Sequence, residues 1–179
     1  MVWITLLKGV NVGGNNVIKM ERLRTILARR GLGTVKTYIQ SGNILCGGPD
    51  RSTVCAVIKG VLAEDFQITC DGVTLPADAL SNAVDAQPFG DVDPKQVHLY
   101  FPCTADTFVN TDHLRAEAKA AEQIAWDQGV LFMHTPGGFG RSPLAAKLPR
   151  LVSAPFTARN LNTCTKLADM AGALALGDL

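Results

Sequence analysis

The sequence lacks several features that would assign a function class at once. Its 17 basic and 16 acidic side chains leave a net charge of +1, so nucleic-acid binding would need a local basic patch. No run approaches the roughly 18 apolar residues of a membrane-spanning helix. The apolar start of the chain is too short for a signal peptide. We therefore expect a cytoplasmic protein that does not associate with membranes.

Motifs for metal, thiol and acyl-transfer chemistry are also missing. The five cysteines contain no C-x-x-C pair, so we expect free thiols in a reducing compartment. The histidines, His98, His113 and His134, match no metal-ligand spacing, and no G-x-S-x-G segment occurs. We expect no metal and no cofactor. A catalytic group assembled from positions far apart in the chain stays open.

The first half of the chain shows a regular order of strand and helix patterns. Hydrophobic residues make up 47% of the 179 and charged residues 18%, which is enough to build a core. The apolar periods predict a strand, a helix, a hairpin around Ser41-Gly42, a helix with Ser52 as N-cap, and a strand, over residues 2–8, 19–30, 35–40 with 43–46, 52–62 and 66–70. This β-α-β-β-α-β order is the split β-α-β arrangement of ferredoxin-like folds.

The second half repeats much of this order. A helix opened by Pro76 is followed by a strand, a helix, a hairpin and two more helices, over residues 96–101, 111–121, 124–126 with 130–134, from Ser142-Pro143 onward, and 158–171. We therefore predict an α+β fold of two packed ferredoxin-like subdomains with mainly antiparallel sheets, residues 1–75 and 76–179. The positions that we expect to be largely buried are Met20, Leu23, Ile26, Leu27, Ile39, Leu45, Val57, Val61, Leu131 and Leu167.

Two glycine-rich loops are the candidate ligand-binding segments. Each follows a strand and leads into a helix, a position where backbone N–H groups can face an anion. Neither has the spacing of a common phosphate-binding motif, and the alternative is that the glycines only supply turn conformations. The candidate residues are Lys8, Asn11, Gly13, Gly14, Asn15 and Lys19 in the first loop, and Gly138, Gly140, Arg141 and Ser142 in the second.

A third candidate lies near the end of the chain. The predicted last helix would place Arg159, Asn162, Thr163 and Lys166 on one polar face, because they are three or four residues apart. Such a face suits contact with a substrate, or hydrogen bonding to a neighbouring loop. We expect Arg141 and Arg159 to be at least partly exposed.

These segments together resemble the bacterial family called domain of unknown function 1697. The resemblance rests on residues 6–20 (LLKGVNVGGNNVIKM), 37–43 (TYIQSGN), 138–142 (GFGRS) and 158–163 (ARNLNT). It implies two ferredoxin-like subdomains side by side, and no activity. The chain departs from the family pattern at Lys8, where arginine is common, and at Leu161, where an aromatic residue is common. A lysine at position 8 would hold an anion less firmly than a bidentate arginine.

From these features we expect a binding module for an anionic, polar ligand, a nucleotide or a nucleic-acid segment, in a cleft between the subdomains. One alternative is a cofactor-independent enzyme that acts on a phosphorylated or carboxylated small molecule. In it, Arg141 and Arg159 would position the substrate and His134 would act as general base. Another alternative is a protein-interaction scaffold that docks partners on its sheet edges. The sequence leaves the oligomeric state open.

Overall fold

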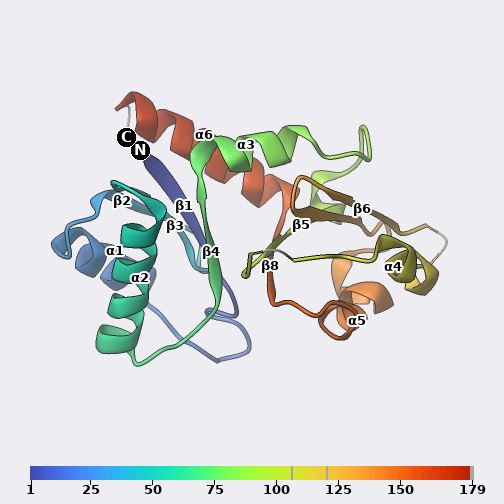
Figure 1. The fold of residues 1–179 in the computed structure, drawn as a ribbon, viewed down its shortest axis with the longest axis horizontal. Coiled ribbons are helices and arrows are strands. Elements are labelled where there is room, and N and C mark those ends of the chain that lie inside the picture. The colour runs from blue at the N-terminus through green and yellow to red at the C-terminus, as the bar shows by residue number, and fades with distance from the viewer. Residues whose placement is uncertain (106, 120, 178–179) are drawn as a thin grey trace. The chain divides into compact units, whose positions relative to one another are not determined.

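The computed structural model describes residues 1–105, 107–119 and 121–177. They form an α+β fold with two four-stranded antiparallel sheets, one in each of two compact units (Figure 1). The first unit comprises Met1–Leu80 and Lys166–Leu179, and the second comprises Ser81–Thr165. The last residues of the chain therefore belong to the first unit.

The first unit has the split β-α-β connectivity. Its sheet has the strand order β2-β3-β1-β4, and the helices α1 and α2 connect β1 to β2 and β3 to β4. The elements are β1 (Val2–Leu7), α1 (Met20–Arg29), β2 (Gly33–Tyr38), β3 (Asn43–Gly47), α2 (Arg51–Phe66) and β4 (Gly72–Pro76).

The two helices of this unit cover one face of its sheet. Figure 1 shows α1 and α2 next to each other on that face. Alternate residues of a strand face opposite sides of a sheet, and Trp3 and Leu7 of β1 face the helices. They pack in a buried cluster with Leu23 of α1 and Ile58 of α2. Burial of apolar side chains, at roughly 25 cal/mol per Å², is the main force that holds this layer together.

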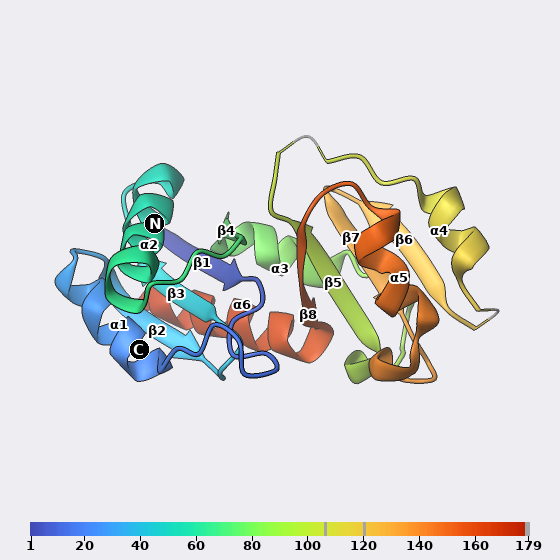
Figure 2. The same cartoon turned by 90° about the horizontal axis from the view of Figure 1, so that it is seen from below.

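The second unit repeats the same connectivity. Its sheet has the strand order β6-β7-β5-β8, and α4 and α5 connect β5 to β6 and β7 to β8. Figure 2 shows both helices on one face of this sheet. The elements are β5 (Val97–Pro102), α4 (Thr111–Glu117), β6 (Gln123–Asp127), β7 (Val130–His134), α5 (Pro143–Leu151) and β8 (Phe156–Asn160). The split β-α-β arrangement predicted from the sequence is thus confirmed in both units.

Two further helices, α3 (Ala77–Asp85) and α6 (Leu161–Leu176), each contribute residues to both units. Leu80 of α3 and Leu167 of α6 are fully buried and belong to the first unit. No helix among the described residues is both long and apolar enough to cross a membrane.

Two strands differ from the sequence prediction. The strand expected over residues 66–70 is wrong, because α2 extends to Phe66 and Gln67 ends it in the left-handed conformation, with φ of 57°. The strand of this part of the chain is β4, which starts at Gly72. The start of the helix predicted over residues 158–171 is also wrong, because residues 158–160 belong to the strand β8. Its residues pair with β5, and this long-range pairing overrides a weak local pattern.

The predicted helix caps are correct in one case and wrong in the other. The Ser142 hydroxyl accepts a hydrogen bond from the N–H of Ala145 at 3.0 Å, and Pro143 follows it at the first helical position, as expected. The expected cap of α2 by Ser52 is wrong, since the carboxylate of Asp50 accepts the N–H of Thr53 at 2.8 Å. Hydrogen bonds from Ser52 and Thr53 lower the pKa of Asp50 to about 2.

Of the ten positions expected in the core, seven are buried, two are half-buried and one is exposed. Ile39 is 48% exposed, and Ile26 and Val57 are half-buried. Ile39 lies outside β2, in the turn that follows it, so its side chain does not alternate with the strand. All five cysteines are free thiols, as predicted.

Candidate functional site

The tip of the first glycine-rich loop is a tight turn that needs the two glycines Gly13 and Gly14. Val12 and Asn15 form an isolated β-bridge, and the N–H of Asn15 donates to the carbonyl of Val12 at 3.0 Å. Gly13 and Gly14 occupy the two central positions with φ of 57° and 79°. Positive φ at both central positions is the geometry of a type I′ turn, which other L-residues adopt at a cost. Turn geometry is therefore one physical reason for this glycine pair.

Two asparagine side chains hold the arms of the loop together. Asn11 accepts the N–H of Ile18 at 2.8 Å and donates to the carbonyls of Ile18 and Gln40 at 3.0 and 2.7 Å. Asn16 donates to the carbonyl of Gly9 at 3.1 Å. Both asparagines have positive φ, a conformation that Asn tolerates better than most residues. The amide of Asn11, a predicted ligand contact, is therefore engaged in fixing the loop.

The hairpin turn after β2 belongs to the same assembly. Gly42 accepts the N–H of Leu7 at 2.9 Å, and a Cβ at Gly42 would lie only 2.8 Å from the Cβ of Leu7. Ile39 adopts a φ of 49°, which is a conformational outlier for a β-branched residue. Strained, exposed residues of this kind cluster at functional sites, which makes this turn a candidate that the sequence analysis missed.

The loop presents donors and positive charge to solvent. Lys8, Gly13, Gly14 and Lys19 are exposed. Within the described residues, the N–H groups of Gly13 and Gly14 have no hydrogen-bond acceptor and the two lysines have no ion-pair partner. Asn15 is also exposed, at the end of the turn. The arrangement can hold an anion, because free N–H groups and ammonium groups supply only donors.

The second glycine-rich loop folds into two successive turns. The N–H of Gly138 donates to the carbonyl of Thr135 at 2.9 Å, and Gly138 has a φ of 91°. Gly140 lies inside the 3₁₀ turn Phe139–Arg141 that follows. Arg141 is exposed, whereas Ser142 is buried and its hydroxyl is used as the cap of α5. Of the predicted contacts in this loop, Arg141 is the one that projects a charge into solvent.

Phe139 from this loop lies over a histidine of the sheet. The rings of Phe139 and His98 are stacked, with centroids 4.0 Å apart. The Nδ1 atom of His98 is buried and has no hydrogen-bond partner among the described residues. Burial lowers the pKa of His98 to about 4, so the ring is neutral at physiological pH.

Arg159 does not lie where the sequence prediction placed it. It is in β8, not in a helix, and it is only 9% exposed, so the expectation of partial exposure is wrong. Its guanidinium donates to the hydroxyl of Thr157 at 3.0 Å and to the carbonyl of Ala158 at 2.7 Å. Burial lowers the pKa of Arg159 to about 10. Arg159 pairs with Leu99, and it faces the side of the sheet opposite to His98.

The predicted polar helix face therefore does not include Arg159, which lies in β8. The other members lie in the first two turns of α6, where Asn162 and Lys166 are exposed and Thr163 is buried. The N–H of Thr163 donates to the side chain of Asn160 at 2.9 Å, which caps the helix. A helix start explains the abundance of Asn and Thr in this segment without a ligand.

Two of the residues named for an enzyme, His134 and Arg159, lie on strands of the sheet of the second unit. The Nδ1 atom of His134 lies 3.2 Å from Oε1 of Gln123, and its Nε2 atom is buried with no partner among the described residues. His134 pairs with Val97 and so shares a sheet face with Arg159, away from His98 and Phe139. No group of three or more His, Cys, Asp or Glu in the described part of the chain is placed to hold a metal.

Sequence reasoning also missed the contact between the first loop and the hairpin turn. The bond from Asn11 to Gln40 joins residues 29 positions apart, and spacing along the chain carries no signal of it. The exposure of Ile39 had no signal in the sequence either, because the apolar pattern predicts a strand that continues to Gln40, whereas β2 ends at Tyr38.

Comparison with known proteins agrees with the fold described above. None of the curated proteins matches the chain. The structure of the conserved bacterial protein SP0830 from Streptococcus pneumoniae is similar, with a TM-score of 0.73 and 21% identity, and the match covers 95% of this chain and 98% of that one. The family model described as "Protein of unknown function (DUF1697)" matches residues 1–132. The chain therefore belongs to the DUF1697 family.

Proposed function

We propose that this protein is a binding module for an anionic, polar ligand, a nucleotide or a nucleic-acid segment, and that the loop Lys8–Lys19 receives its anionic group. One observation supports the proposal above the others. The exposed N–H groups of Gly13 and Gly14 lie at a turn whose arms are fixed by asparagine side chains, and a lysine flanks the loop at each end. A rigid loop loses little conformational entropy when it binds.

Exposed apolar side chains in the same assembly favour a nucleotide over a simple anion. Val12, Val17 and Ile39 are 62%, 67% and 48% exposed. Val12 and Val17 lie on the two arms of the loop, and Ile39 precedes Gln40, whose carbonyl is bonded to Asn11. A nucleotide offers both an anionic phosphate and a flat apolar base face. The expectation that the second loop shares a cleft with the first stays a prediction.

The test is a titration of the purified protein with adenosine triphosphate, inorganic phosphate, adenosine and a short single-stranded oligonucleotide at two salt concentrations. Lys8→Gln combined with Lys19→Gln should weaken nucleotide binding about tenfold or more, because each ammonium group supplies a charge-assisted contact that is partly screened by solvent. Salt should weaken binding with a shallow slope, since few phosphates are neutralised.

Lys95→Gln is the matched control, because Lys95 is exposed and lies in the other unit. It should bind like the wild type. Arg141→Ala tests separately whether the second loop takes part. The proposal is wrong if the wild type binds none of these ligands, or if the double lysine variant binds them as tightly as the wild type does.

A further inference from the structure

A pocket inside the first unit carries a second inference. It is a small pocket between α2 and the strands β1 and β4, and it is partly open to solvent. Leu7, Ile58 and Leu62 supply its apolar wall. The polar groups that line it are the hydroxyls of Thr5 and Thr74, the thiols of Cys55 and Cys70, and the ammonium group of Lys59.

The two threonines leave one donor unused. Their hydroxyl oxygens are 2.8 Å apart, and both residues are 3% exposed. One hydroxyl proton forms this bond, so the second proton has no acceptor within the described residues. A buried donor without an acceptor destabilises the folded protein, and an acceptor that enters the pocket would remove this cost.

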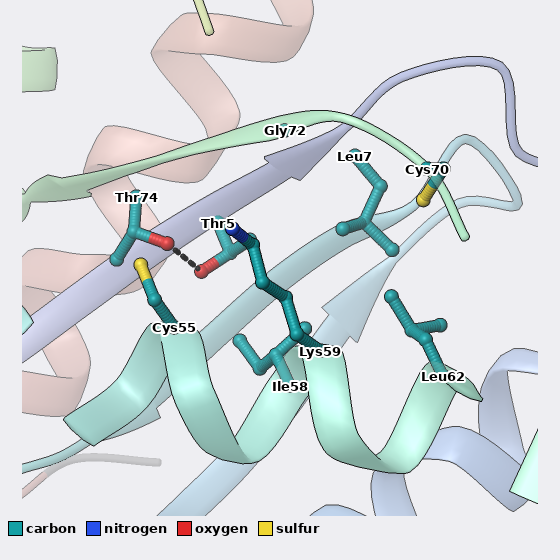
Figure 3. Close-up of a pocket in the computed structure, with 9 residues that line it drawn as sticks. All are labelled: Thr5, Leu7, Cys55, Ile58, Lys59, Leu62, Cys70, Gly72 and Thr74. Carbon is teal, nitrogen blue, oxygen red and sulfur yellow. Dashed lines mark hydrogen bonds between the residues drawn. The ribbon is translucent and has the colours of Figure 1, made fainter. Parts of the chain in front are cut away.

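The charged and apolar groups of the pocket lie at different ends. Figure 3 shows Thr5, Thr74 and Cys55 together at one end, with the Lys59 side chain extending from α2 toward Thr5. Leu7, Leu62 and Cys70 lie toward the other end (Figure 3). Lys59 has no ion-pair partner among the described residues.

The charges around the pocket also determine at which end an anionic group would bind. Burial, with a smaller contribution from the charge of Asp71, raises the pKa of Cys70, so this thiol is neutral. The carboxylate of Asp71 therefore disfavours negative charge at the Cys70 end, and the Lys59 ammonium favours it at the threonine end. The Lys59 ammonium can only donate, and one hydroxyl of the threonine pair has a proton left to donate, so a ligand that supplies acceptors matches this end of the pocket.

We propose that this pocket binds a small aliphatic carboxylate. Its carboxylate would accept from Lys59 and from the free hydroxyl of the Thr5–Thr74 pair, and its short chain would lie against Leu7, Ile58 and Leu62. The site is separate from the loop proposed above for the nucleotide. It therefore stands or falls independently of that function.

The experiment is a calorimetric or NMR titration of the full chain with acetate, butanoate, hexanoate and octanoate, and with hexan-1-ol and hexylamine as probes without a carboxylate. Affinity should rise from acetate to hexanoate as more CH₂ groups are buried, about fourfold for each, which corresponds to about 0.8 kcal/mol. The alcohol should bind more weakly than hexanoate, and the amine should not bind. Equal binding of the alcohol and hexanoate would overturn the assignment of a carboxylate site.

Two variants and one control test the assigned contacts. Lys59→Gln removes the charge, and Thr5→Val with Thr74→Val removes both hydroxyls at once, which leaves no unpaired partner and preserves the side-chain shape. Each should weaken hexanoate binding about tenfold. Lys95→Gln should leave it unchanged. The proposal fails if both pocket variants bind hexanoate as the wild type does.

Cysteine alkylation gives a readout that does not depend on variants. Hexanoate in the pocket should slow the reaction of Cys55 and Cys70 with iodoacetamide, as followed by mass spectrometry of peptides. Cys103 is half-buried in the other unit and serves as the internal control. Equal slowing of all three thiols, or of none, would contradict binding in this pocket.

Discussion

At the scale of single residues, the two arginines of the second unit illustrate how burial changes a role. Arg141 is exposed, and Arg159 is buried with its guanidinium bonded to Thr157 and to the backbone. Arg159→Ala should lower the free energy of unfolding by about 2 kcal/mol or more, because it removes hydrogen bonds and leaves a cavity. Arg141→Ala should change it by less than about 0.5 kcal/mol. Urea unfolding of both variants checks this contrast, and equal losses would contradict it.

His98 provides a second prediction at this scale. Its pKa of about 4 lies below the usual value near 6.5, so the unfolded chain binds a proton more readily than the folded one between these pH values. The contribution of His98 to the free energy of unfolding is therefore fully present above pH 6.5 and is lost as the pH falls toward 4. His98→Gln should lose less stability than the wild type between pH 7 and pH 4.5.

A variant of Phe139 tests whether burial under this ring lowers the pKa of His98. Its ring stacks on His98 and helps to bury it. Phe139→Ala should therefore raise the pKa of His98 toward the ordinary value, as an NMR titration of the histidine ring protons would show. If the pKa stays near 4 in this variant, the burial comes from the remaining neighbours and not from the loop.

At the scale of elements, Gly42 and Gly129 form a natural pair in two hairpin turns. Both have positive φ, of 74° and 77°, but a Cβ at Gly42 would meet Leu7 at 2.8 Å and one at Gly129 would meet nothing within 4 Å. Gly129→Ala should cost about 1 kcal/mol from backbone strain alone. Gly42→Ala should cost about 1–3 kcal/mol more from the steric clash. Equal unfolding free energies for the two variants would show that the structure around Gly42 and Leu7 shifts to accommodate the added methyl group.

The local apolar pattern predicts some helices and strands better than others. Periodic apolar residues predicted the helix α1 and the hairpin β6–β7 to within one residue, since each forms its pattern within its own segment, whereas α2 continues four residues beyond the predicted end. The strands β4 and β8 were misplaced or missed. Both are edge strands that are defined by pairing with β1 and β5, and no short segment carries that information.

The candidate sites follow the same rule. Lys8, Gly13, Gly14 and Lys19 were found because glycine and lysine stand out in a single short segment. The Thr5–Thr74 pair joins residues 69 positions apart and could not be found in this way. The only local signal was a threonine in the otherwise apolar run of β1, where a buried hydroxyl needs a partner.

At the scale of the whole molecule, the end of the chain completes the first unit. Leu167 of α6 is fully buried there, whereas Leu176 of the same helix is 78% exposed. Leu167→Ala should lower the free energy of unfolding by about 2–5 kcal/mol, and Leu176→Ala should leave it nearly unchanged. In a Trp126→Phe background, Trp3 is the only tryptophan left, so its fluorescence reports the first unit. Equal urea midpoints for the two variants would show that α6 does not contribute to that unit.

The division of the first unit between the two ends of the chain has a consequence for biosynthesis. The 85 residues of Ser81–Thr165 separate its two parts, so at 5–20 residues per second the ribosome delivers the second part roughly 4–17 s after the first. The second unit is continuous and needs no residue from outside Ser81–Thr165. The first unit, although its larger part is made first, cannot be completed until α6 has been synthesised, and until then its unfinished core is open to chaperones and proteases.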